Sequence, residues 1–327
     1  MLGINSTVIA AVAGVAASLL VWAASSWQAK LAEGASPPIG NFVETSLGRV
    51  HLMDMGPNDP RGAPLPDNPP IVLIHGASVN LRDMLIALGE ELVRTHRVIL
   101  IDRAGRGYSD RPRDGHVLDV QAQQIHEALN AIGVARPVVV GQSLGGAVAL
   151  SYALQYQEDI SGLVLLAPVS HEWPGGVAWY NGASNVPVVG TILRRVLIPI
   201  YGRFVSRGSV AESFAPNTPP EDYYERAGVS LLFRPGDFKA NAADLYRLKP
   251  QIISMQGGYG ALELPTVIAV GDADTTVSPE IHAKTLVQQM PNAKLVVFPG
   301  VGHALHHARS AEICETIRAL ASEEPAL

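Results

Sequence analysis

The chain has 327 residues, enough for one large core or for a core with a smaller insertion. Its formal net charge of −6 offers no basic field for a nucleic acid, so no partner of that kind is expected. The single cysteine, Cys314, excludes a disulfide within the chain, and its helix-like surroundings suit a small buried hydrophobic residue.

The N-terminal stretch is uniformly apolar. Residues 4–24 carry no charge and are long enough to cross a bilayer as a helix, with Trp22 and Trp27 where interfacial aromatic residues would lie. We therefore expect residues 1–28 to be a single membrane anchor. The alternatives are a cleaved signal segment, which would leave a secreted or periplasmic protein, and a core helix. Residues 29–40 are small, polar and Pro-containing, as in a linker.

Strand and helix patterns alternate through the rest of the chain. An antiparallel pair of strands is expected on either side of residues 47–48. Buried strands follow at residues 71–76, 97–105, 137–143, 162–170, 265–272 and 293–300. Helical spacing separates them, for example at residues 81–95 and 117–133. This alternation predicts an α/β fold with a doubly wound, mostly parallel sheet of eight strands.

One long segment breaks the alternation. Residues 171–260 contain several prolines and tryptophans and no clear core strand, so we expect a helical cap inserted between the sixth and seventh strands. The core would then be divided into residues 41–170 and 261–327. Loops at the carboxyl ends of parallel strands are where ligands bind in this architecture. The cap is therefore expected to shape the substrate site.

A serine lies on the bend between a buried strand and a helix. Residues 141–145 read GQSLG, which fits G-x-S-x-G with Ser143 at its centre, after a run of valines and before an Ala- and Leu-rich helix. Such a bend lifts the hydroxyl clear of the sheet and presents backbone N–H groups at the start of the helix, where negative charge is favoured. Ser143 is therefore a candidate nucleophile.

A serine needs an imidazole and an orienting carboxylate before it can react. Asp272 and Asp274 follow one buried strand, and His303 follows the next. With this order of Ser, Asp and His, and with the stretches IVLIHGAS and IDRAGRGYSDRP upstream, the chain resembles the α/β-hydrolase superfamily over nearly all its length outside the N-terminal segment.

This resemblance implies roles for individual residues. Ser143 would be the nucleophile, and His303 the general base and then the general acid. Asp274 would orient His303, because Gly271, Asp274 and Val277 match the family pattern G-x-x-D-x-x-V. Asp272 and, less favoured, Glu172 are the alternative acids, with a turn role expected for Asp272.

The resemblance also implies an oxyanion hole formed by the backbone N–H groups of Ala77 and Leu144. His75 is expected to be structural. His303 and His307 are four residues apart, but we found no carboxylate to complete a metal site, so packing or surface roles are expected for His306 and His307. No cofactor is implied.

The function expected from these motifs is hydrolysis of carboxylic esters of small or lipophilic substrates through an acyl-enzyme. Hydrolysis of carbon–carbon bonds and a cofactor-free haloperoxidase reaction use the same three residues and remain alternatives. A ligand-binding receptor of the same fold is a further one. Dehalogenases and epoxide hydrolases have an aspartate at the nucleophile position, so Ser143 argues against both.

Overall fold

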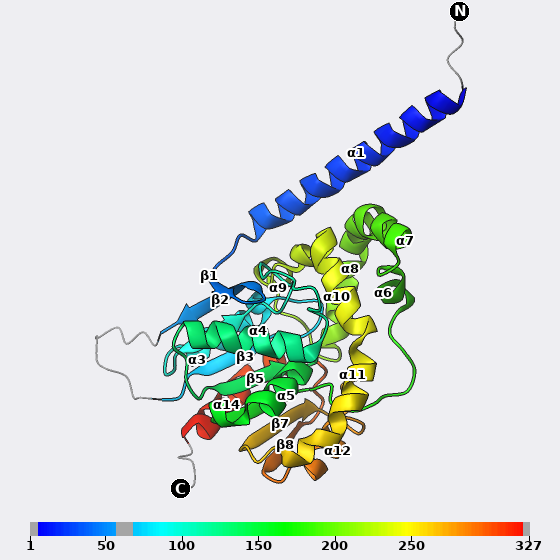
Figure 1. Cartoon of the computed structure of the whole chain (residues 1–327). Coiled ribbons are helices and arrows are strands. Elements are labelled where there is room, and N and C mark those ends of the chain that lie inside the picture. Colours follow the sequence, from blue (N-terminus) through cyan, green and yellow to red (C-terminus); the bar gives the residue numbers. More distant parts are fainter. Residues whose placement is uncertain (1–5, 57–67, 323–327) are drawn as a thin grey trace, which may run out of the picture.

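The computed structural model describes residues 6–56 and 68–322, and its centre is one sheet of eight strands (Figure 1). The strands are β1 (Asn41–Thr45), β2 (Gly48–Met55), β3 (Ile71–Ile74), β4 (Val98–Ile101), β5 (Val138–Gln142), β6 (Gly162–Leu166), β7 (Thr266–Gly271) and β8 (Ala293–Phe298). Their order across the sheet is β1-β2-β4-β3-β5-β6-β7-β8. The pairs of β2 with β1 and with β4 are antiparallel, and the remaining pairs are parallel. The predicted fold class is therefore confirmed.

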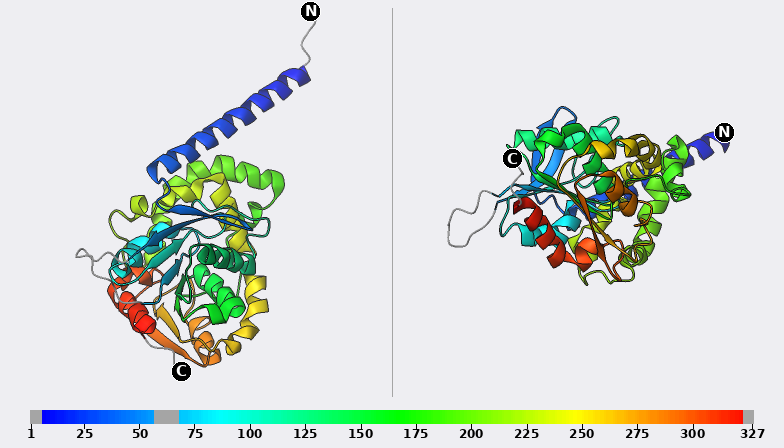
Figure 2. Two further views of the ribbon diagram at one scale, coloured as in Figure 1. Left: turned by 60° about the vertical axis from the view of Figure 1, so that its left-hand side comes forward. Right: turned by 90° about the horizontal axis from the view of Figure 1, so that it is seen from below.

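Helices cover both faces of the sheet (Figure 2). One face packs against α4 (Leu118–Ala131), α5 (Leu144–Tyr156) and α12 (Ala283–Gln289). The other packs against α2 (Leu81–Met84), η1 (Leu85–Gly89), α3 (Glu90–Leu92), α13 (Leu305–Ala308) and α14 (Ser310–Ser322). A short 3-10 helix, η2 (Gln157–Asp159), follows α5.

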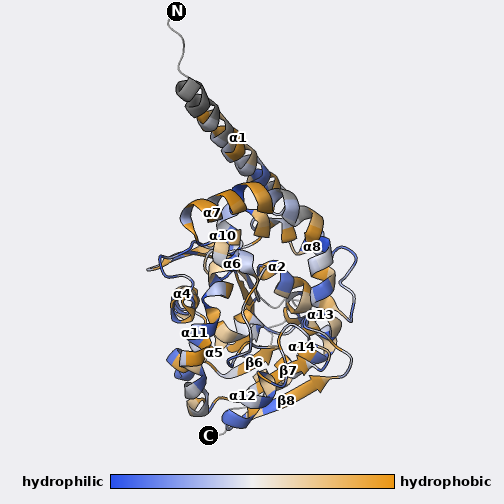
Figure 3. Ribbon diagram, turned by 90° about the vertical axis from the view of Figure 1, so that its right-hand side faces the viewer, coloured by the Kyte–Doolittle hydropathy of each residue, from blue (hydrophilic) through white to orange (hydrophobic). Residues whose placement is uncertain are grey.

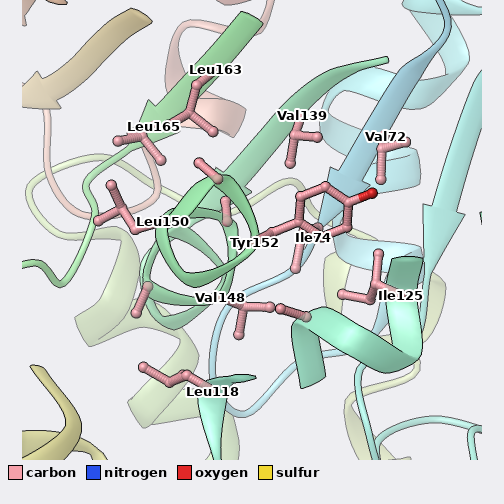
Figure 4. Packing of buried hydrophobic residues seen from close by; sticks show 14 of the residues in the cluster. Val72, Ile74, Leu118, Ile125, Val139, Val148, Leu150, Tyr152, Leu163 and Leu165 are labelled. Atoms are coloured by element: carbon pink, nitrogen blue, oxygen red, sulfur yellow. The ribbon is translucent and has the colours of Figure 1, made fainter. Parts of the chain in front are cut away.

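The sheet has a hydrophobic core on each face, because successive side chains of a strand point to opposite faces. In β3, Val72 and Ile74 point into the cluster under α4 and α5, whereas Ile71 and Leu73 point to the opposite face. Figure 4 shows the first cluster, where Val148 of α5 and Ile125 of α4 lie against the strand residues. Because both faces are covered, the central strands are apolar throughout, which is why they read as continuous runs in the sequence.

Between β6 and β7 the chain forms a helical segment, which we call the insertion. Its elements are α6 (Trp179–Ala183), α7 (Pro187–Ile192), η3 (Leu193–Leu197), α8 (Ile198–Phe214), α9 (Tyr223–Arg226), η4 (Val229–Phe233), α10 (Pro235–Tyr246), α11 (Leu248–Met255) and η5 (Gln256–Ala261). Hydrophobic stretches of α7 and α8 lie at one end of the molecule, close to the N-terminal helix (Figure 3).

The N-terminal helix, α1 (Ser6–Ala35), corrects one expectation. Within the described residues, no helix combines the length and the apolarity needed to cross a membrane, so the prediction of a membrane-anchored protein is wrong. In the described part, the apolar run ends at Ser25, and the last turns carry the charged residues Lys30 and Glu33. Glu33 pairs with Arg234 of the insertion at 3.0 Å, which places this end of the helix against the protein.

The helix also continues to Ala35, through most of the stretch predicted as a linker. Residues 1–5 of the predicted N-terminal segment and residues 323–327 of the predicted second core part lie outside the described residues. The division into core and cap domains stays a prediction.

Candidate active site

Ser143 occupies a tight turn between β5 and α5. Its backbone has φ 55° and ψ −116°, a conformation that non-glycine residues rarely adopt. The turn is held by a hydrogen bond from the Ser143 N–H to the Leu166 carbonyl at 2.9 Å. A side chain at Gly145 would overlap the carbonyl oxygens of Ile74 and His75, and one at Gly141 would overlap the Gly145 carbonyl. The two glycines of the motif are therefore required by close backbone approach.

The Ser143 hydroxyl meets an imidazole from the far end of the chain. His303 lies in the loop between β8 and α13, and its Nε2 is 3.0 Å from Ser143 Oγ. Its Nδ1 is 2.7 Å from Asp274 Oδ2. Nδ1–H donates to the carboxylate, so the lone pair of Nε2 faces the serine hydroxyl. Serine, imidazole and carboxylate thus form one continuous hydrogen-bonded chain.

Asp274 is itself fixed by the turn that carries it. Its Oδ1 accepts the backbone N–H groups of Thr276 at 2.8 Å and Val277 at 2.9 Å, which leaves Oδ2 for His303. Asp272 instead accepts the Gly300 N–H at 2.7 Å. Glu172 is exposed, and its backbone N–H donates to Gln256 at 3.0 Å. Of the three candidate acids, the structure brings Asp274 to His303.

The two backbone amides expected to form the oxyanion hole follow the carboxyl ends of two neighbouring strands, β3 and β5. Leu144 is the first residue of α5, where an N–H has no acceptor within the helix. Ala77 follows β3, which pairs directly with β5. The next residue, Ser78, has a positive φ of 63° and is held by Asn241 of the insertion. Its N–H donates to Asn241 Oδ1 at 2.7 Å, and its Oγ accepts from Asn241 Nδ2 at 3.1 Å. Sequence reasoning did not identify Asn241.

Comparison with known proteins gives the family. The profile of the alpha/beta hydrolase fold family matches residues 69–309, which is most of the chain and includes all three residues of the hydrogen-bonded chain. The chain belongs to the α/β hydrolase fold family. The predicted resemblance to this family is thereby confirmed.

The relatives of this α/β hydrolase include several hydrolases. A 2-hydroxymuconate semialdehyde hydrolase from Pseudomonas putida is 28% identical, over 87% of this chain and 95% of the length of that hydrolase. Haloalkane dehalogenase 2 from Mycobacterium bovis is 27% identical, over 80% of this chain and 87% of the length of that dehalogenase. The solved structure of an esterase from Exiguobacterium antarcticum superposes with a TM-score of 0.67 at 20% identity, covering 87% of this chain and 100% of the esterase, and shows the same fold. The chain is therefore an enzyme, a hydrolase of this fold.

His75 has a structural role in the loop that follows β3. Its Nδ1–H donates to the Gly76 carbonyl at 2.8 Å, and its Nε2 accepts the Arg103 N–H at 3.1 Å. Burial lowers the pKa of His75 to about 3, so the ring is neutral at neutral pH. Arg103 in turn donates to the His75 carbonyl at 3.0 Å and pairs with Asp244 of the insertion at 3.1 Å. These contacts connect the β3 loop to the insertion.

The histidines beyond His303 have a partner that we did not expect. His306 Nε2 lies 2.9 Å from Oδ2 of Asp83, and His307 Nε2 lies 2.8 Å from Oδ1 of the same carboxylate. Asp83 is on α2, far away in the sequence. The structure thus brings to His306 and His307 a carboxylate that the sequence did not indicate. In the described part of the chain, Asp83, His306 and His307 are the group of residues able to hold a metal ion.

Proposed function

We propose that this α/β hydrolase cleaves carboxylic esters through an acyl-enzyme formed on Ser143. One observation carries the proposal: the chain from Ser143 Oγ to His303 Nε2, and from His303 Nδ1 to Asp274 Oδ2, with distances of 3.0 and 2.7 Å. A serine hydroxyl becomes a good nucleophile only when a base accepts its proton, and the base works best when a third group fixes its tautomer.

The proposed reaction has two stages. Ser143 Oγ attacks the ester carbonyl carbon while its proton moves to His303 Nε2. The resulting oxyanion accepts hydrogen bonds from the N–H groups of Ala77 and Leu144. The imidazolium then protonates the leaving alcohol, and a water molecule activated by the same imidazole hydrolyses the acyl group from Ser143. Asp274 stays ionised and stabilises the imidazolium throughout.

A lipophilic ester is the substrate class that we favour. The insertion and the adjoining core border a cavity of about 720 Å³ whose walls include Trp173, Trp179 and Tyr246. Aromatic walls of this kind retain apolar groups. Ser143 is not part of this lining, so the preference for a lipophilic ester rests on the aromatic residues of the insertion.

Labelling with a fluorophosphonate tests the nucleophile. The wild-type protein is expected to be labelled on Ser143, and Ser143→Ala is expected to lose both the label and the hydrolysis of p-nitrophenyl esters. Ser46→Ala is the matched control, because Ser46 is an exposed serine bonded to Glu127 on the surface. Label that persisted in Ser143→Ala would show that the nucleophile lies elsewhere.

Hydrolysis of a carbon–carbon bond is the second candidate function. It is favoured by the similarity to the 2-hydroxymuconate semialdehyde hydrolase, which spans 95% of that protein. The same three residues would serve either reaction. Parallel measurement of kcat/KM on p-nitrophenyl esters of increasing chain length and on a ring-cleavage dienoate separates the two. A dienoate value at least about 100-fold above the best ester would favour the carbon–carbon reaction.

A further inference from the structure

A buried cluster of two imidazoles and one carboxylate includes His306 and His307, three and four residues beyond His303. Asp83 is 2% exposed and His306 3% exposed, and the His307 side chain is 5% exposed. One ligand atom from each of the three residues lies within 4.8 Å of the other two. Two imidazoles and one carboxylate are a common ligand set for zinc and related divalent ions.

The direction of the two imidazoles requires an explanation. Neighbouring residues on a helix normally point about 100° apart and do not share a contact. His306 and His307 nevertheless direct their Nε2 atoms to the two oxygens of one carboxylate, with ring centroids 4.5 Å apart. Hydrogen bonds from both imidazoles to one carboxylate produce this convergence, and a cation coordinated by the same three side chains would produce it as well.

The surroundings of Asp83 also favour a cation. Its carboxylate is buried, and its side-chain partners are the two imidazoles and the Tyr223 hydroxyl. Among the described residues, no lysine or arginine side chain forms an ion pair with it. A buried carboxylate without a fixed cation beside it is stabilised by a bound metal ion.

Groups around the cluster hold its ligands in place. The Tyr223 hydroxyl of the insertion donates to Asp83 Oδ1 at 2.7 Å, as an outer partner of a metal-binding carboxylate would. The rings of Phe214 and Tyr223 pack against His307, each with its centroid at 5.1 Å. These aromatic rings cover the cluster on the side of the insertion.

We propose that Asp83, His306 and His307 bind one divalent transition-metal ion of the zinc type. Zinc lies about 2.0–2.2 Å from nitrogen and oxygen ligands, so neighbouring ligand atoms are about 3.3 Å apart in a tetrahedral site. The observed separations of 2.9 and 2.8 Å therefore need to widen by about 0.5 Å. The proposal therefore requires a small rotation of the two imidazoles. The ion would join α2 and α13 under the insertion, and its role would be structural.

Metal content of the protein without a tag tests the proposal. The chain is refolded in the presence of a chelator, dialysed, mixed with Zn²⁺ or Co²⁺ and desalted. Elemental analysis is expected to find about one zinc per chain, and Co²⁺ is expected to give the visible absorption of a site with nitrogen ligands. At zinc about 100-fold above its Kd, Tm is expected to rise by about 5 °C.

The variants His307→Gln and His306→Gln are expected to lose this stoichiometry and the shift in Tm. His116→Gln is the control, because His116 is half-buried and its ring nitrogen lies beside Arg247 rather than a carboxylate. Wild-type protein that bound no zinc at micromolar concentration would refute the proposal, even if the variants failed to fold. Zinc retained by both His306→Gln and His307→Gln would also refute it, because the ion would then lie elsewhere. Neither result bears on the role of Ser143.

Discussion

Replacing Asn241 by alanine is expected to impair the reaction without touching the three reacting side chains. Asn241 lies on α10 of the insertion and is 4% exposed. Its amide makes two hydrogen bonds to Ser78, the residue directly after the proposed oxyanion donor Ala77. Ser78 adopts a positive φ of 63°, so its conformation depends on such support.

The size of the effect follows from these contacts. Loss of both hydrogen bonds leaves the Ser78 N–H without its partner, at a cost of about 1–3 kcal/mol. The strained turn can then relax and move the Ala77 N–H away from the oxyanion. Complete loss of one oxyanion donor lowers the rate by about 10²–10³, and a displaced donor retains part of its effect. We therefore expect kcat to fall about 10- to 100-fold, with KM changed less than about 3-fold, because the donor acts mainly in the transition state.

Steady-state kinetics with a p-nitrophenyl ester measures the effect, and the rate of fluorophosphonate labelling gives an independent readout. Asn185→Ala is the matched control, because the Asn185 side chain bonds only within the insertion, to the Asn181 carbonyl at 2.8 Å. A kcat for Asn241→Ala within about twofold of wild type, in a protein whose Tm has fallen, would show that Asn241 only stabilises the fold.

Three further predictions concern the carboxylate, a buried histidine and the serine turn. Asp274→Asn should lower kcat by about 10⁴ in ester assays, because the imidazole loses the acceptor that fixes its tautomer; an effect below about 10-fold would contradict the role of Asp274. Burial lowers the pKa of His75 to about 3, so between that pH and the pKa of the unfolded chain the unfolded state binds the extra proton. When urea denaturation is repeated at pH 4.5 instead of 6.5, the free energy of unfolding should therefore fall by about 2 kcal/mol more in wild type than in His75→Gln. Equal losses of stability in the two proteins would contradict the lowered pKa of His75. Gly145→Ala should destabilise the protein by about 3 kcal/mol, because its new side chain overlaps two backbone carbonyls, whereas Gly236→Ala meets no atom within 4 Å and should have almost no effect on Tm.

Most of the fold could be predicted because its signals are local. The central strands are buried on both faces, so stretches such as Val138, Val139 and Val140 are apolar at every position. The turn at Ser143 depends on glycines two residues away on either side, and it therefore appears as a short motif. The choice of Asp274 over Asp272 was also local, since its carboxylate accepts N–H groups from the same turn.

The remaining features depend on residues that only the tertiary structure brings together. Asp83 meets His306 and His307 across more than 220 residues, and nothing near Asp83 in the sequence indicates this contact. Asn241 reaches Ser78 from the middle of the insertion, 163 residues away. The expectation that the N-terminal segment spans a membrane rested on apolar composition alone. The ion pair of Glu33 with Arg234, 201 residues away, was not visible in that composition. Apolar periodicity carries no information on such long-range pairs.

The position of His303 near the end of the chain has a consequence for biosynthesis. The turn with Ser143 is held by backbone hydrogen bonds to Leu166 and Val169, whereas the imidazole arrives on the loop after β8, the edge strand of the sheet. During synthesis from the N-terminus, the alcohol is therefore inert until the last strand has joined its neighbour. Until that point the incomplete chain lacks the base that makes Ser143 a nucleophile.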